Sequence, residues 1–541
     1  MTDRVLVSKH IAALLPSIHN ERNISLLVRE IAKSPLLDST DSVLLFIDAV
    51  SAACVRKKQI SNPTIPVDRF FTTLAAEAAS VSVVPGLAIL AGIGLATPPN
   101  GTERVSRYIV HNARYAATLL QLDPALVVAC LAKAQYFLND EAMDRIPLLH
   151  YWPTILDSLY PPKPAPKPTE YNFQDFGAYS HLTSKALERL SVIEEFLERC
   201  DWFVKAMVSH YAQSESLNTF KTLLFGVTLQ LQGIANQILH NKRMDAGFVC
   251  HKILALLQTL GFVINETGGS YDTYLYVYHL CIDVLTETSS QNAVNCVTEL
   301  AAWSSKNPDN PVDRGELLFF LQVCESLLAK LDSEVLDSHV LPMATHYLKP
   351  RGELSDRAML QAAHSFMLEY FELGYSAMAR HISAKSADEH VETYLNEIVA
   401  LYPSIATWDQ FNLAVSKVSQ ALSQPFSDPS NIRAKVLERL YELAKASIPG
   451  VPVASSVGIH PPSLRCAYVS VLIAALPKLC DQQSFDMWLQ RVTAMIPEEY
   501  SPETGMERRY IKSELADMTS GLDLTLADIG IRYWFQQAAK L

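Results

Sequence analysis

The apolar residues of this 541-residue chain recur every three or four positions, and this spacing constrains the fold more than any other feature. One face of an α-helix has this period, because the helix turns once every 3.6 residues. The alternation of apolar and polar residues typical of half-buried strands is not convincing in any segment. The pattern therefore predicts an all-α protein. It is clearest in two stretches: Leu217, Phe220, Leu223, Leu224, Val227, Leu231 and Ile234, and Leu317, Phe320, Leu321, Cys324, Leu327, Leu328 and Leu331.

Further segments are also predicted to be helical. The tyrosine-rich stretch from Tyr271 to Leu285 follows the helical period although its composition suits a strand. The apolar stretch Val81–Ala96 is shorter than the roughly 20 residues that span a bilayer, so we expect a buried helix, with a contact on one membrane face as the alternative. Asp313 lies three residues before Glu316, a capping-box spacing that predicts a helix start at Asp313.

Several helical segments contain a Leu-Pro or Ile-Pro step, but no strict sequence period emerges. Helices of this length joined by short turns suit a degenerate stack of helix pairs. We expect an irregular α-solenoid of antiparallel helix pairs, similar to HEAT or armadillo arrays. The predicted organisation is an N-terminal helical block (1–160), a proline-rich linker (161–170), a central helical-repeat block (171–447), a Pro/Gly-rich loop (448–463), a C-terminal helical block (464–538) and a terminal tripeptide (539–541).

Charge and cysteine content exclude several classes of protein. The net charge of −12 disfavours a surface that follows nucleic-acid phosphates, so we expect no nucleic-acid partner. The nine cysteines are widely separated, which argues against a disulfide framework or a zinc ribbon and favours packing in the core. Lys9 and His10 interrupt the N-terminal apolar residues, so no signal peptide is expected.

The sequence lacks the common catalytic and metal-binding motifs, such as G-x-S-x-G, H-E-x-x-H and the Walker loop. His339 and His346 could share a helix face, but a metal site needs further ligands. The acidic pairs Glu194–Glu195 and Glu498–Glu499 are adjacent in sequence and so point in different directions on a helix. We therefore expect no enzyme activity, no cofactor and no metal, and we interpret the acidic pairs as solvated surface.

The specific functional signal is the terminal tripeptide Ala539, Lys540 and Leu541. Its small, basic and leucine residues match the form of the C-terminal peroxisomal address S-K-L, which a receptor reads. A free carboxylate can be captured by amide donors while Leu541 fills an apolar pocket. These residues are the predicted receptor-binding site.

The tail, the helical array and the missing catalytic motifs together resemble the peroxin-8 family of fungal peroxisome-biogenesis proteins. The stretch Leu360–Phe371, LQAAHSFMLEYF, which follows the expected helix Val340–Leu348, is also similar to a segment of that family. The resemblance implies a non-enzymatic organiser on the lumenal side of the peroxisomal membrane, peripherally attached. It implies binding to the targeting-signal receptor peroxin-5, connection of the docking and RING-finger translocon subcomplexes, and help with cargo release.

The sequence is also compatible with two other functions. One is a cytosolic or nuclear HEAT-like scaffold in which the AKL terminus is fortuitous. The other is a peroxisomal enzyme with an unfamiliar helical active site. The proline-rich segment 161–170 is also an alternative SH3 ligand.

Overall fold

The computed structural model confirms the predicted all-α class. It describes residues 2–34, 37–96, 119–162, 167–168, 170–211, 217–241, 244–301, 306–349, 356–375, 384–420, 432–448, 461–479, 481–496 and 502–538. Within these ranges the regular structure is helical and no strand occurs. The chain separates into two compact units, Met1–Val284 and Leu285–Leu541, and the division falls inside helix α15.

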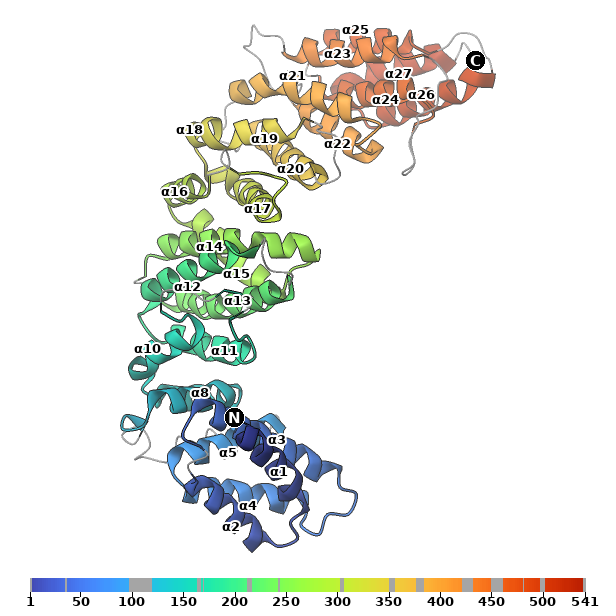
Figure 1. The fold of residues 1–541 in the computed structure, drawn as a ribbon. Helices are drawn as coiled ribbons and strands as arrows, with labels where there is room; N and C mark the ends of the chain where they lie inside the picture. Colours follow the sequence, from blue (N-terminus) through green and yellow to red (C-terminus); the bar gives the residue numbers. More distant parts are fainter. Residues whose placement is uncertain are drawn as a thin grey trace. The chain divides into compact units, whose positions relative to one another are not determined.

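The first unit is built from consecutive helices that lie side by side (Figure 1). They are α1 (Thr2–Leu14), η1 (Leu15–Ser17), α2 (Glu21–Lys33), α3 (Thr40–Gln59), α4 (Val67–Ser80), α5 (Val83–Ala96), α8 (Pro124–Ala134), η3 (Gln135–Phe137), α9 (Asp140–Asp144), α10 (Leu148–Leu159), α11 (Phe176–Leu187), α12 (Ile193–Val208), α13 (Leu217–His240), α14 (Ala246–Thr267) and α15 (Asp272–Glu287).

The second unit continues in the same way. Its helices are α16 (Ser290–Leu300), α17 (Pro311–Leu327), η6 (Leu328–Lys330), α18 (Ser333–Val335), the π-helical turn η7 (Leu336–Val340), α19 (Leu341–Tyr347), α20 (Asp356–Gly374), α21 (Ala384–Leu401), α22 (Trp408–Val418), α23 (Ile432–Ala446), α24 (Leu464–Ala475), η9 (Leu476–Lys478), α25 (Gln482–Thr493), α26 (Pro502–Ser520) and α27 (Leu524–Ala538).

Within each unit, helices pack against helices that are close in the chain. In the first unit α3 packs against α5, α11 against α13 and α12 against α14. In the second unit α23 packs against α24, α24 against α26 and α25 against α27. Contacts restricted to near neighbours are typical of an α-solenoid, in which each layer buries the apolar face of the next. The predicted solenoid architecture is confirmed.

A close approach of helices α11 and α13 explains why residue 233 is a glycine. A Cβ atom on Gly233 of α13 would lie 2.2 Å from the main-chain oxygen of Ser184 in α11. The main chain cannot move aside as a flexible side chain can, so only glycine fits at this contact. The helix pair therefore depends on a residue that is unfavourable inside an isolated helix.

The apolar segment near residue 90 forms the expected buried helix. In α5 only Leu95 and Val83 among the described side chains are more than slightly exposed. Among the described residues, the helix that has the length and hydropathy of a membrane span is instead α14, with 22 residues, and 72% of its most apolar window is buried. Such burial is typical of the core helix of a folded domain.

The other helix predictions are confirmed, with one correction. The first of the two most regular stretches lies in α13, and the tyrosine-rich stretch forms α15. The second stretch lies in α17 up to Leu327 and continues through η6 to its cap, Leu331. The start predicted at Asp313 is wrong. The helix cap is Asn310, whose side chain accepts from the Val312 amide at 2.9 Å. Pro311 explains the difference, because its fixed φ suits the first helical position and it has no amide hydrogen to satisfy.

Helices on either side of the proline-rich segment pack against each other. α10 contacts α11, and the Tyr171 hydroxyl donates to the Leu159 carbonyl at 2.6 Å. The buried Tyr160 donates to Gln230 Oε1 in α13 at 2.5 Å. The described helices before and after this segment thus share one core. The sequence-based block boundaries stay predictions, as does the role of 163–166, which lies outside the described residues.

Candidate functional site

The predicted receptor-binding residues follow directly after the last helix of the second unit. Ala539, Lys540 and Leu541 lie outside the described residues, so their role stays a prediction. What the structure gives is α27, which ends at Ala538. The geometry of this helix fixes the point from which the tail departs.

α27 is anchored at its beginning and along one face. The Asp523 carboxylate accepts from the amides of Thr525 and Leu526 at 3.0 and 3.1 Å, which satisfies helix amides that have no partner within the helix. A hydrogen bond from the Thr525 hydroxyl, together with those amides, lowers the pKa of Asp523. Leu526 is buried, and the helix packs against α25 and α26.

The outer face of α27 carries apolar side chains. Leu524 is 95% exposed, Ile531 46% and Phe535 67%. Their spacing of seven and four residues places them on one side of the helix. We call these three residues the α27 stripe. An exposed apolar row is a common feature of interaction surfaces. The spacing of these residues is readable from the sequence, but their exposure depends on which side of α27 its neighbours cover.

A pocket lies among α20, α21 and α22, with a volume of about 350 Å³. Its wall is mainly aliphatic, formed by Leu360, Leu368, Ile398, Leu401, Ile405 and Leu413. His364 and Tyr394 also line it, and His364 Nδ1 lies 3.1 Å from the Tyr394 hydroxyl. Asp, Glu and Cys are missing from its described lining.

The titration of this pocket does not suit acid-base chemistry near neutral pH. Burial lowers the pKa of His364 to about 4, so its imidazole is neutral at pH 7. Burial raises the pKa of Tyr394, so its hydroxyl keeps its proton. A general acid or base works best when its pKa lies near the working pH. The pocket has the character of an apolar recess.

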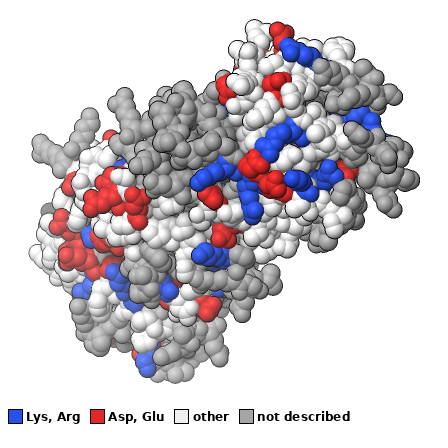
Figure 2. Space-filling model, turned by 90° about the horizontal axis from the view of Figure 1, so that it is seen from above, with Lys and Arg blue, Asp and Glu red and all other residues white. Residues whose placement is uncertain are grey.

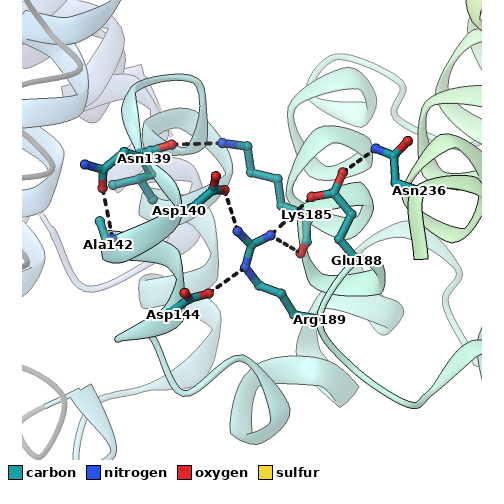
Figure 3. A network of polar contacts seen from close by, with 9 residues as sticks. Asn139, Asp140, Ala142, Asp144, Lys185, Glu188, Arg189 and Asn236 are labelled. Atoms are coloured by element: carbon teal, nitrogen blue, oxygen red, sulfur yellow. Dashed lines mark hydrogen bonds and ion pairs between the residues drawn. The ribbon is translucent and has the colours of Figure 1, made fainter. Parts of the chain in front are cut away.

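Polar contacts elsewhere join successive helices. Arg189 Nη2 donates to Asp140 Oδ1 at 2.6 Å, and its Nε donates to Asp144 Oδ1 at 3.0 Å (Figure 3). Asn236 in α13 donates to Glu188 Oε1 at 2.7 Å. The network therefore links α9, the end of α11 and α13. Because its charged groups satisfy each other, it acts as a structural connection between layers.

The expected role of the cysteines is confirmed where the structure describes them. Cys54, Cys130, Cys200, Cys250, Cys281, Cys296, Cys324 and Cys466 are all buried, and Cys480 lies outside the described residues. Burial raises the pKa of Cys130 and Cys200 to about 12. Since the thiolate is the reactive form, these thiols behave as packed apolar groups.

Other sequence candidates do not assemble into a site. In the part of the chain that the structure describes, no group of three or more His, Cys, Asp or Glu side chains could hold a metal. His339 is half-buried and His346 is exposed. Glu194 and Glu195 are exposed, and Glu195 accepts from the Trp152 indole at 2.9 Å. Glu498 and Glu499 lie outside the described residues.

The surface charge agrees with the composition. On the face that Figure 2 shows, basic side chains lie beside acidic ones. Ion pairs such as Lys435–Glu392 and Arg491–Glu438 join helices of the second unit. Where the structure describes this face, its mixed charge does not favour a phosphate backbone.

Comparison with known proteins connects this architecture to peroxisomes. Residues 281–372 match the PEX8 central TPR-like domain. The chain is 24% identical to peroxisomal biogenesis factor 8 of Pichia angusta, over 100% of this chain and 92% of that protein. It is 23% identical to peroxisomal membrane protein PEX17 of Yarrowia lipolytica, over 99% of this chain and 93% of that protein.

The family match covers the centre of the chain, and the similarities to the two peroxisomal proteins cover its whole length. The TPR-like match covers the stretch from the end of α15 to most of α20, which includes Leu360–Phe371, where the sequence itself showed a resemblance. The similarities to the two peroxisomal proteins extend over the remaining helices at both ends. By its helical fold, its central domain and its length-wide similarity, this chain is a peroxin-8-like protein.

Proposed function

We propose that this chain is a non-enzymatic adaptor of peroxisomal matrix-protein import that works on the lumenal side of the peroxisomal membrane, to which it is peripherally attached. The observation that carries the proposal is the AKL terminus directly after α27, in a chain similar to peroxisomal biogenesis factor 8. Helical arrays offer long surfaces for several partners, which suits a scaffold.

The proposed receptor contact uses Ala539, Lys540 and Leu541. The chain's terminal carboxylate accepts hydrogen bonds from donors of peroxin-5, and Leu541 fills an apolar pocket. Ala539 is small enough to allow close approach, and Lys540 adds a positive charge. The remaining helical surface then connects the docking and RING-finger subcomplexes of the translocon, and receptor binding by the tail assists cargo release.

Removing the last two residues tests the receptor contact. The full chain and a variant that lacks Lys540 and Leu541 are titrated against the helical-repeat domain of peroxin-5. We expect the truncation to weaken binding at least 100-fold, which corresponds to a loss of about 3 kcal/mol or more in binding free energy. The reason is that the truncation deletes the Leu541 side chain and moves the terminal carboxylate two residues back along the chain. A matched control, Lys540→Arg, keeps the charge and should bind within a few-fold of wild type. Unchanged binding by the truncated chain would show that the tail is not the contact.

The localisation has a separate test. Protease is added to intact peroxisomes and to peroxisomes opened with detergent, and the chain is followed by immunoblot. A lumenal protein is protected until detergent is added. A freely accessible pool outside the organelle would favour the cytosolic or nuclear scaffold instead.

A further inference from the structure

We propose that the α27 stripe is a second docking surface for the receptor that captures the tail. This inference rests on the proposed function, because it assigns the same partner to Leu524, Ile531 and Phe535. The partner surface is an apolar patch on the rim of the receptor domain, next to its carboxylate-binding groove.

The stripe is long enough to form part of an interface. From Leu524 to Phe535 the helix rises about 16 Å, at 1.5 Å per residue. All three side chains point to the same side because seven and eleven residues are close to two and three helical turns. The opposite side of the helix is occupied, since Leu526 is buried and α27 packs against α25 and α26.

The α27 stripe lies close in the chain to the tail that the receptor binds. Phe535 lies six residues before Leu541, so a fully extended chain between them reaches at most about 22 Å. A domain of 100 residues already has a radius of gyration of about 13 Å, and its full width is larger still. A receptor domain that closes on the carboxylate therefore lies over or beside the C-terminal end of α27. Phe535 is the stripe residue closest to that point.

The charge of α27 favours a protein partner over a lipid surface. The only charged residues in the sequence of α27 are Asp528 and Arg532, whose opposite charges cancel, and both side chains are exposed. Helices that lie on anionic membranes usually carry several lysines or arginines on the polar face. The stripe has apolar side chains without this basic flank, so it fits an apolar protein patch.

Single substitutions on the outer face test the stripe in the full chain. Phe535→Ser and Leu524→Ser are titrated against the peroxin-5 helical-repeat domain, alongside the tail truncation and a peptide of residues 536–541. Met506→Ser is the matched control, because Met506 is 66% exposed on the neighbouring helix α26 and is not part of the stripe. Circular dichroism and the thermal midpoint show that each variant is folded.

We expect the wild-type chain to bind more tightly than the peptide. Phe535→Ser should weaken binding about tenfold, the effect expected when one large apolar side chain is no longer buried. Leu524→Ser, farther from the tail, should have a smaller effect, and Met506→Ser should have none.

The outcomes separate the two proposals. If the truncation abolishes binding but Phe535→Ser, Leu524→Ser and wild type bind equally, the stripe inference is overturned and the tail contact stands. If the truncated chain binds as wild type does, the tail contact fails, and the stripe inference fails with it. In a parallel experiment, wild type and Phe535→Ser are tested for binding to vesicles of phosphatidylcholine and phosphatidylserine. If Phe535→Ser loses vesicle binding but binds the receptor as wild type does, the stripe is a lipid contact and the inference is overturned.

Discussion

Two helices that carry large apolar side chains, α5 in the first unit and α27 in the second, reach different environments. Leu87 and Ile89 of α5 are fully buried, and the helix is packed by α3, α4 and α8. α27 packs against α25 and α26, and Leu524 on its outer face is almost fully exposed. The difference is the number of sides on which neighbouring helices lie. An apolar helix is a core element when enclosed, and an interaction surface when one side stays open.

The largest expected effect comes from opening a cavity in the enclosed helix. Leu87→Ala should lower the free energy of unfolding of the first unit by about 2–5 kcal/mol, because a fully buried leucine is lost and close packing limits relaxation. Urea unfolding of the full chain, followed by circular dichroism, measures it. A loss below 1 kcal/mol would mean that α5 is not enclosed as the structure has it.

A pH effect in the second unit is the next largest. The folded-state pKa of His364 is about 4 against an ordinary 6.5, so between these values the unfolded chain binds the proton more strongly. The stability that neutral His364 contributes is full above pH 6.5 and is lost as pH falls toward 4. The shift corresponds to at most about 3 kcal/mol.

The variant that isolates this effect is His364→Phe. Wild type should lose more stability than the variant between pH 7 and pH 4, as measured by urea unfolding at each pH. Parallel stability curves for the two proteins would contradict the low pKa of His364.

The helical fold could be predicted from the periodicity of the sequence, whereas the exposed apolar surface of α27 and the pocket near His364 could not. Helices such as α13 and α15 were predictable because the 3.6-residue period is local in the sequence. The start of α17 was misplaced because the capping-box spacing at Asp313 was followed, whereas Pro311 suits the first helical position and Asn310 before it caps the helix.

The candidate sites divide in the same way. The tail could be found because the address is a linear motif. The pocket near His364 brings three helices together, and the exposure of Phe535 depends on which side of α27 its neighbours cover. Neither property is local in the sequence.

Two Arg–Glu pairs sharpen the comparison of the units. Arg29 and Glu77 join α2 to α4 with Nε–Oε2 at 2.6 Å, and the Glu77 side chain is only 8% exposed. Arg491 and Glu438 join α25 to α23 through bonds of 2.7 Å, but the Glu438 side chain is 47% exposed. Hydrogen bonds from the arginine lower the pKa of each glutamate.

Glu77→Gln should therefore destabilise the chain by about 1–3 kcal/mol at pH 7, and Glu438→Gln by less than about 1 kcal/mol. Since both pKa values are lowered on folding, the stabilisation is present above the ordinary carboxyl pKa and is lost as pH falls through the folded value. Wild type and Glu77→Gln should converge in stability at acid pH. Equal losses for the two variants at pH 7 would show that burial does not separate the pairs.

The smallest expected effect is the most direct test of the open side of α27. Leu524→Ala removes the same atoms as Leu87→Ala, yet Leu524 loses almost no contact with water on folding. Hydrophobic stabilisation scales with the apolar area that folding buries, so the free energy of unfolding should change by less than about 0.5 kcal/mol. The same urea titration measures both variants, which makes each the control of the other. A loss of 2 kcal/mol for Leu524→Ala would mean that another part of the chain covers the stripe, and it would then be part of the core.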